Sequence, residues 1–500
     1  MEQGTLIIEV TTNDYAMPVS GAQVTVQNSG QQLELTTDQN GRTPVIGVRT
    51  PDRALSQQPN ATEKPYSLYN VTVQAQGYPP VQINGVQAFP GIESVLPVDL
   101  TQLMEGRDTR GRTGTIVVDI PENALESNVP RQPEAPQEST GLQRILTNVY
   151  IPETVTVHLG RPTASARNVT VSFLDYIKNV ASSEIYPTWP ENALRANIHA
   201  QVGFVLNRIF TEWYTSRGYD FNITNSTAYD QSFVEGRNIF SNISRIVDEI
   251  FNIYPRRQGH TEPLFSSYCN GSTVTCAGLS QWGTVNLANS GYTPLQIIRY
   301  YYGQNVDLVE TNDIRGIEES YPGFLLRRGS ENQYVRTIQQ QLMRVRQNYP
   351  AIPAISSATG FFGSQTEAAV RAFQRLFGLT VDGIVGRATW YQLSYIYAAV
   401  KRLAELDSEG EPLPETPEVV PYPGYLIKQG ARGSDVRTMQ QYLRDTSRVY
   451  SQVPTIEADG IFGPKTLAAV RAFQRLFGLT VDGIVGPRTW NMLTRVWSNL

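Results

Sequence analysis

The sequence has few of the residues that bind metals or form cross-links. Its 500 residues include two cysteines, Cys269 and Cys276, and three histidines. The cysteines do not form a C-x-x-C pair and the histidines are scattered, so we predict no metal site and no cofactor. The cysteines could close a small disulfide loop or remain two thiols, because the sequence does not reveal the redox compartment.

Long runs of one kind of residue are also missing. The net charge is −5 and no long basic run occurs, which argues against nucleic acid as a partner. No stretch approaches the roughly 20 apolar residues of a membrane span. The first ten residues lack the basic and apolar regions of a signal peptide. We therefore expect a soluble chain that is made in the cytoplasm without a recognisable signal peptide.

What the sequence does contain is a change of pattern along the chain. Hydrophobic residues make up 40% of it, enough for several buried cores. Apolar and polar residues alternate at 6–10, 22–26 and 71–75, which predicts an N-terminal β-sandwich over residues 1–120. Residues 121–150 carry four prolines among polar residues. We predict that this segment is an exposed linker, open to proteases.

The rest of the chain predicts a multidomain α+β protein. Residues 151–310 combine a strand at 155–159 with helical patterns, which indicates a central mixed α/β domain. Residues 368–386 recur unchanged at 468–486, and each copy of about 80 residues suits a small domain. We predict two three-helix domains, at 320–400 and 423–500, joined by an acidic, proline-rich linker at 401–422.

Glu184 stands where a helix pattern calls for an apolar residue. The preceding stripe has the spacing of one helix face, and aromatic residues follow directly (Ile177, Val180, Ala181; Tyr186, Trp189). A carboxyl group on such a face loses hydration, which raises its pKa and prepares it as a general acid for glycosidic bonds. The alternative is an acid at a helix end, partly exposed or paired with Lys178 or Arg195.

The repeats resemble peptidoglycan-binding domains of the small three-helix type. The resemblance rests on many positions (Gly360-Phe-Phe-Gly363, Thr366, Phe373-Gln374, Asp382-Gly-Ile-Val-Gly386 and Thr389-Trp390, with counterparts in the second copy). It implies peptidoglycan as a partner. Most of these positions are core and turn residues, so they identify the fold and not the groove that contacts sugars.

The central segment resembles the catalytic domain of stage II sporulation protein D. The matching stretches are Asp175–Glu184, Trp189-Pro190 and Gly278–Gly283. That family cleaves glycan strands as lytic transglycosylases, with a motif glutamate as the acid, which here maps onto Glu184. The candidate substrate-binding residues are Arg195, Tyr186, Tyr229, Gln281 and Trp282, although Trp282 could equally be core. Relatives carry a Cys/His zinc pair in the loop that corresponds to 222–232, where this sequence has neither residue.

The order of segments resembles that of clostridial spore cortex-lytic enzymes, with an N-terminal part similar to carboxypeptidase-regulatory-like domains (Pro18–Val26, Thr37–Gly41, Ala75–Tyr78). This resemblance implies cortex peptidoglycan bearing muramic lactam as the substrate. It also implies a zymogen that a subtilisin-like germination protease cuts between about 127 and 150, which would free the β-domain. The expected location is the cortex or coat region of the spore, after synthesis in the mother cell.

Other functions remain open at this point. A glycan hydrolase would need a second carboxylate, for which Glu191, Asp220 and Asp230 are candidates with ordinary structural roles as alternatives. An N-acetylmuramoyl-L-alanine amidase would usually need a zinc site, which the histidine spacing does not support. A non-catalytic spore-layer protein would use the repeats alone for binding.

Overall fold

The computed structural model describes residues 2–13, 16–59, 61–104, 114–127, 129, 149–314, 321–407, 423, 425–450, 452–477, 479 and 481–498. The chain forms two compact units, Met1–Ala404 and Glu405–Leu500. The mixed α+β, multidomain character predicted from the sequence is confirmed. Most of the predicted linker at 121–150, and residues 408–422 of the acidic linker, lie outside the described residues.

The N-terminal part consists of two five-stranded sheets that share one apolar core. One sheet joins β1 (Glu2–Thr12), β2 (Met17–Pro18), β5 (Ile46–Thr50) and β8 (Glu93–Asp99). The other joins β3 (Gln23–Asn28), β4 (Gln31–Thr36), β6 (Ser67–Gln74), β7 (Val81–Ala88) and β9 (Ile116–Asp119). Alternate side chains of β1 point into this core, and Leu6, Ile8 and Val10 are fully buried.

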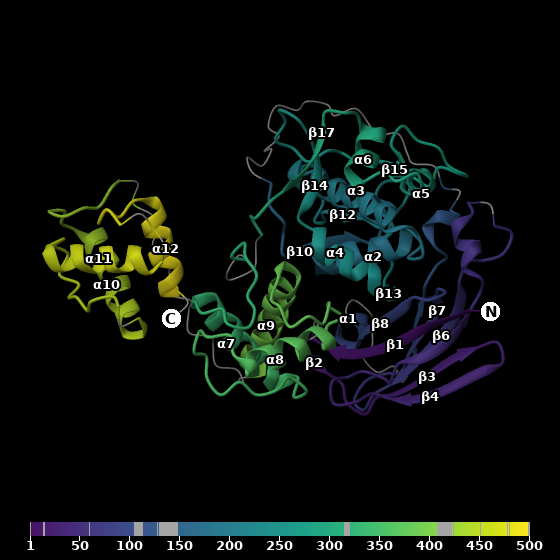
Figure 1. Ribbon diagram of the computed structural model, residues 1–500, viewed down its shortest axis with the longest axis horizontal. Helices are drawn as coiled ribbons and strands as arrows, with labels where there is room; N and C mark the ends of the chain where they lie inside the picture. Colours follow the sequence, from purple (N-terminus) through teal and green to yellow (C-terminus); the bar gives the residue numbers. More distant parts are fainter. Residues whose placement is uncertain are drawn as a thin grey trace. The chain divides into compact units, whose positions relative to one another are not determined.

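The fifth strand of the first sheet comes from the central part of the chain. Strand β13 (Ile239–Phe240) pairs antiparallel with the outer edge of β8 (Figure 1). Beside it, Asn238 donates to the carbonyl of Gln87 (2.8 Å) and accepts from the Gln87 amide (3.1 Å). The N-terminal and central parts therefore share a sheet and a buried polar contact.

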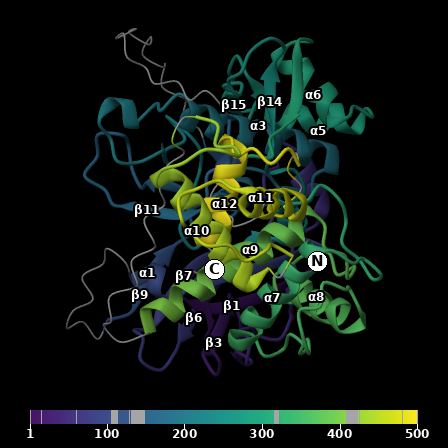
Figure 2. The same ribbon diagram turned by 90° about the vertical axis from the view of Figure 1, so that its left-hand side faces the viewer.

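Helix α3 (Glu191–Phe210) is the centre of the next part and is buried on nearly all sides. Around it pack α2 (Phe173–Glu184), α4 (Ser241–Ile250), α5 (Gln281–Asn289) and α6 (Pro294–Tyr302) (Figure 1). Figure 2 shows α5 and α6 beside α3 from a second side. Small sheets complete this part: β10 (Thr154–His158) with β11 (Asn168–Ser172) and β12 (Ile223–Thr224), β14 (Ile253–Arg257) with β17 (Val306–Glu310), and β15 (Tyr268–Cys269) with β16 (Leu279–Ser280).

The ends of α2 and α3 are set by local sequence. The Ser172 hydroxyl caps α2 by accepting from the Asp175 amide, and the helix stops where Ile185 turns extended, two residues before Pro187. Pro190 is the N-cap of α3. These boundaries put Glu184 on the last position of α2.

Each repeat folds into three helices, as predicted. The first has α7 (Gln333–Asn348), α8 (Ser364–Leu376) and α9 (Arg387–Asp407), and the second has α10 (Ser434–Val449), α11 (Pro464–Leu476) and α12 (Pro487–Ser498). Identical sequence gives identical bonds, since Gln374 and Gln474 each donate to the carbonyl ten residues on (2.9 and 3.0 Å). Gly378 takes the left-handed conformation expected after α8 (φ 65°).

His199 makes stability depend on pH. Its ring is buried in α3 and bonds through Nδ1 to the carbonyl of Ile253 (3.0 Å), and burial lowers its pKa from 6.5 to about 4. The folded state thus binds fewer protons than the unfolded chain, so stability is full above pH 6.5 and falls by about 3 kcal/mol as pH drops to 4.

We predict that His199→Asn, which can keep a donor near the carbonyl, flattens the pH dependence of thermal unfolding between pH 7 and 4. The matched control is His260→Asn, which alters an exposed histidine beside Glu262 and should leave the wild-type dependence unchanged. Equal dependence in wild type and His199→Asn would contradict this role.

Candidate active site

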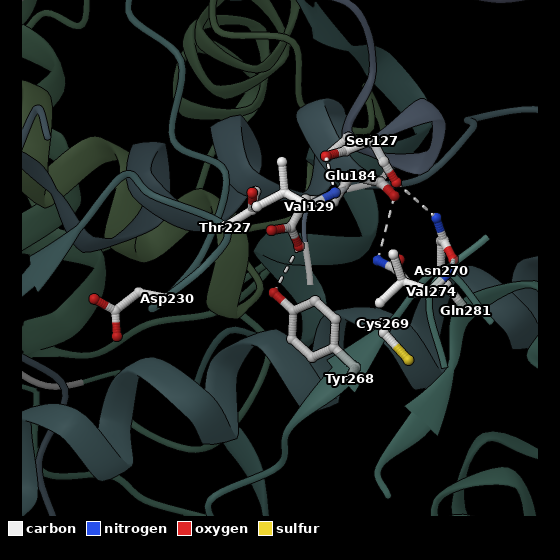
Figure 3. Close-up of a pocket in the computed structure, with 11 residues that line it drawn as sticks. Ser127, Val129, Glu184, Thr227, Asp230, Tyr268, Cys269, Asn270, Val274 and Gln281 are labelled. Carbon is white, nitrogen blue, oxygen red and sulfur yellow. Dashed lines mark hydrogen bonds between the residues drawn. The ribbon is translucent and has the colours of Figure 1, made fainter. Parts of the chain in front are cut away.

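Glu184 is a buried acid held by three hydrogen-bond donors. Its side chain lies at the end of α2, and the residue is 3% exposed. Oε2 accepts from Nε2 of Gln201 (2.9 Å) and from the hydroxyl of Tyr268 (2.6 Å), and Oε1 accepts from the amide of Ser232 (2.7 Å). The donors come from α3, β15 and the loop after Asp230, so three elements fix the position of one carboxyl group. Figure 3 shows the hydrogen bond from Tyr268.

A pocket opens beside this carboxyl group. Its volume is about 440 Å³ when the solvent space at its open side is included. Glu184 and Tyr268 share its wall with Gln281, whose Nε2 donates to the backbone carbonyl of Glu184 (3.3 Å). The other lining residues that the structure describes have short polar or apolar side chains, and none of them is a lysine or arginine: Ala124, Ser127, Val129, Thr227, Asp230, Cys269, Asn270 and Val274.

The environment acts on Glu184 in two opposite ways. Burial disfavours a negative charge, whereas three donors aimed at the oxygens favour it. The cations considered as its partners are engaged elsewhere, because Lys178 pairs with Asp248 (2.8 Å) and Arg195 pairs with Glu191 (2.7 Å). The three donors named above for this carboxyl group are all neutral.

Of the five candidate substrate-binding residues, Gln281 lines the pocket. Tyr186 and Trp282 are buried in an aromatic cluster with Trp189, in which the rings of Trp189 and Trp282 lie 4.8 Å apart. Trp282 is thus a core residue, which is one of the two roles that the sequence allowed for it. Arg195 belongs to an ion-pair network with Glu191 and Glu249, and Tyr229 contributes its carbonyl to Arg208 (3.4 Å); neither side chain lines the pocket.

Asp230 lines the same pocket but has structural partners. Its Oδ1 pairs with Nε of Arg208 (2.9 Å), and Oδ2 accepts from the hydroxyls of Tyr214 (2.6 Å) and Thr224 (2.7 Å). Figure 3 shows it apart from Glu184. These bonds hold the loop whose Ser232 amide reaches Glu184.

The other candidates for a second carboxylate lie elsewhere. Glu191 is in the network of Arg195 and Arg245, and Asp220 is exposed and accepts from Asn168 (3.0 Å). Glu184 and Asp230 are the carboxylic acids among the pocket residues that the structure describes.

Sequence reasoning missed the three donors. Ser232 contributes a backbone amide, which leaves no trace in the side-chain pattern. Tyr268 is far from Glu184 in sequence and follows no motif. Gln201 gave a weak signal, since it is a polar residue between Ile198 and Val202 on a stripe that the helix buries.

A segment from the N-terminal side covers part of the pocket. We call residues 124–127 and 129 the roof segment; its Ala124, Ser127 and Val129 line the pocket. The side-chain amide of Asn270 donates to the carbonyls of Leu125 (3.2 Å) and Ser127 (3.1 Å). Glu126 accepts from the hydroxyl of Tyr66 (2.6 Å), and burial raises the pKa of this carboxyl group.

The two cysteines form a disulfide, which resolves the alternative that the sequence left open. Cys269 and Cys276 close a loop that contains Asn270, the residue that holds the roof segment. The disulfide therefore stabilises the loop to which the roof segment is hydrogen-bonded.

The described part of the chain contains neither a cluster of metal ligands nor a helix that could span a membrane. No group of three or more His, Cys, Asp or Glu side chains is placed to hold a metal ion. No helix in that part has both the length and the apolar character needed to cross a membrane.

Comparison with known proteins identifies the repeats. Residues 331–393 and 432–493 match the family described as "Putative peptidoglycan binding domain". The two repeats are peptidoglycan-binding domains.

The relatives that match the chain include an amidase and a spore cortex-lytic enzyme. The N-acetylmuramoyl-L-alanine amidase CwlL of Bacillus licheniformis is 32% identical over 172 residues, which is 33% of this chain and 44% of that protein. A spore cortex-lytic enzyme of Bacillus cereus is 41% identical over 70 residues, or 14% of this chain and 25% of that protein. The chain thus spans less than half of either relative.

A solved structure, the SleB N-terminal domain, is 38% identical to this chain and is covered to 97%, over 15% of this chain. The TM-score is 0.14, too low to compare the folds. The chain therefore combines peptidoglycan-binding domains with similarity to peptidoglycan hydrolases, and the central part with Glu184 is without a match to the peptidoglycan-binding family.

We predict that Asp230→Asn destabilises the protein by about 3–5 kcal/mol, because the Arg208 guanidinium stays buried without its counter-charge. Asp220→Asn is the matched control at an exposed site and should cost less than about 0.5 kcal/mol. Chemical denaturation of both proteins checks the difference. Similar midpoints would show that Asp230 does not have this structural role.

Proposed function

We propose that the protein is a spore cortex-lytic enzyme that cleaves the glycan strands of cortex peptidoglycan as a lytic transglycosylase. The observation that supports this most directly is the difference between the two carboxyl groups among the pocket residues that the structure describes. Glu184 is held by neutral donors, whereas Asp230 is committed to Arg208. A lytic transglycosylase needs one acid that also acts as a base, and a hydrolase of the usual kind needs two carboxyl groups.

The proposed reaction uses Glu184 twice. In its protonated form it donates a proton to the glycosidic oxygen, the bond from this oxygen to C1 of the muramyl residue breaks, and an oxocarbenium-like centre develops. The carboxylate then takes the proton of the 6-hydroxyl of the same sugar while O6 bonds to C1. The products are a 1,6-anhydro end and a free hydroxyl on the neighbouring sugar, and water takes no part.

The roof segment supports a precursor form. Its residues line the pocket, and it is held there by Asn270 and by the hydrogen bond from Tyr66 to Glu126. A protease that cuts between about 127 and 150 would give this segment a free end and loosen it from the rim. The proposed cutter is a subtilisin-like germination protease, and the site of cutting lies mostly outside the described residues.

The two peptidoglycan-binding domains would keep the enzyme on its polymer. Two weak sites on one chain act at a high effective concentration when the linker lets both engage, so retention exceeds that of either site. The similarity to spore cortex-lytic enzymes supports the spore wall as the location and cortex peptidoglycan, with its muramic lactam, as the substrate.

A second candidate is an N-acetylmuramoyl-L-alanine amidase, which the name of the relative CwlL favours. An amidase would cleave the bond between the muramyl residue and the first alanine, leaving the glycan strands intact. Release of stem peptides, and loss of this release on addition of a chelator, would support it. A non-catalytic binding protein would release neither product.

We predict that wild-type protein, activated by cutting, releases fragments with anhydro-muramyl ends from purified cortex, and that Glu184→Gln lowers this release at least about 1,000-fold because the amide cannot donate the proton. Mass spectrometry of the soluble fragments is the measurement. The control is binding of both proteins to sedimented cortex, which should be equal. Full activity of Glu184→Gln would refute the role of this residue.

We predict that cutting the folded full chain within 131–148, at an inserted site for a specific protease, raises cortex release at least about 10-fold, because the roof segment is no longer tied at both ends. Cutting is preferable to truncation, since Tyr66, Phe89 and Leu125 share the core of the central part. The uncut chain with the same insertion is the control. Equal activity before and after cutting would contradict the precursor model.

A further inference from the structure

A chain of buried hydrogen bonds leads from the core to Glu184. The hydroxyl of Tyr176 donates to Oε1 of Gln231 (2.9 Å), Nε2 of Gln231 donates to the hydroxyl oxygen of Tyr268 (2.9 Å), and Tyr268 donates to Oε2 of Glu184 (2.6 Å). Tyr176 and Gln231 are fully buried and Tyr268 is 5% exposed. Because Gln231 donates to Tyr268, the proton of Tyr268 is directed at Glu184.

The three donors to Glu184 differ in what they can do when its charge changes. The Ser232 amide can only donate, and Gln201 faces Glu184 with its NH2 group, which also only donates. The hydroxyl of Tyr268 can both donate and accept. Of these three groups, Tyr268 alone is suited to both protonation states of the acid.

The proposed reaction passes through both states in each turnover. Glu184 must hold a proton before the glycosidic bond breaks, and must be a carboxylate when it takes the proton of the 6-hydroxyl. A partner that only donates favours the carboxylate and opposes the return of the proton. A hydroxyl that can turn around supports both.

We propose that Tyr268 is a positioning residue for Glu184, donating to Oε2 of the carboxylate and accepting from the same oxygen when it is protonated. In the protonated state the Tyr268 oxygen accepts from Gln231 and Glu184 together, and its own proton turns toward the pocket that Tyr268 lines. Oε2 thus keeps its place while its proton comes and goes. This inference rests on the proposed function of Glu184.

Tyr268→Phe tests the inference, with Tyr176→Phe as the matched control. Both variants remove one buried hydroxyl of the same chain, but only the first touches Glu184. In the cut full-length protein, with formation of anhydro-muramyl ends as the readout, Tyr268→Phe should lower kcat about 100-fold with KM for cortex within about two-fold. Tyr176→Phe should stay within about five-fold of wild type.

The pH profile of kcat separates the two roles of Tyr268, because it would not change if Tyr268 contributed only to packing. Loss of a charge-assisted donor disfavours the carboxylate, so the alkaline limb of kcat should shift to higher pH in Tyr268→Phe and stay in place in Tyr176→Phe. A kcat within three-fold of wild type, or an unmoved limb, would overturn the inference. If Tyr268→Phe does not fold, Gln231→Met removes the donor that directs the hydroxyl; it should lower kcat about 10-fold, and wild-type kcat would overturn the inference.

Failure of this inference can be told apart from failure of the proposed function. If Glu184→Gln is inactive while Tyr268→Phe keeps wild-type kcat and pH profile, Glu184 is the acid and Tyr268 does not position it. If Glu184→Gln is fully active, the proposed function itself is wrong.

Discussion

The central part of this protein is organised by the need to satisfy one buried carboxyl group. A charge at the position of Glu184 would be costly in an apolar interior without hydrogen bonds. Donors from α3, from β15 and from the loop after Asp230 meet this need. Two of these donors are themselves held in place. The Arg208–Asp230 pair holds the loop that carries Ser232, and Gln231 is hydrogen-bonded to Tyr268. Geometry that suits a general acid is thus also a constraint on the fold.

The same region depends on the N-terminal part. Strand β13 completes the first N-terminal sheet, and Tyr66, Phe89 and Leu125 pack with the aromatic residues around Trp189. The roof segment extends this contact to the pocket. There it accepts a hydrogen bond from Asn270, which belongs to the loop closed by the disulfide. The contact that lines the pocket is therefore built into the packing of two parts of the chain.

The sequence predicted those features that depend on local pattern. The stripe before Glu184 predicted α2, and the identical stretches at 368–386 and 468–486 predicted two equal three-helix folds. Periodicity also gave the β-rich N-terminal part, because alternation reflects a half-buried strand. The acid itself stood out as a polar residue in an apolar stripe.

The partners of the acid could not be predicted, because they depend on long-range packing. Ser232 acts through its backbone, Tyr268 is 84 residues away from Glu184, and the roof segment precedes it by about 60 residues. Tyr186 and Trp282 were candidates for substrate binding, with the core as the alternative for Trp282, and the structure buries both in an aromatic cluster. Composition alone cannot separate an aromatic that stacks on sugar from one that packs on other rings.

The central claim, glycan cleavage without water, is tested most directly by digesting purified cortex in water enriched in oxygen-18 and locating the heavy oxygen by mass spectrometry. The account predicts anhydro-muramyl ends without heavy oxygen, because the 6-hydroxyl of the sugar attacks C1. Heavy oxygen at C1 would mean a hydrolase with a second carboxylate, and heavy oxygen in the lactyl carboxyl group would mean an amidase. Either result would contradict the account.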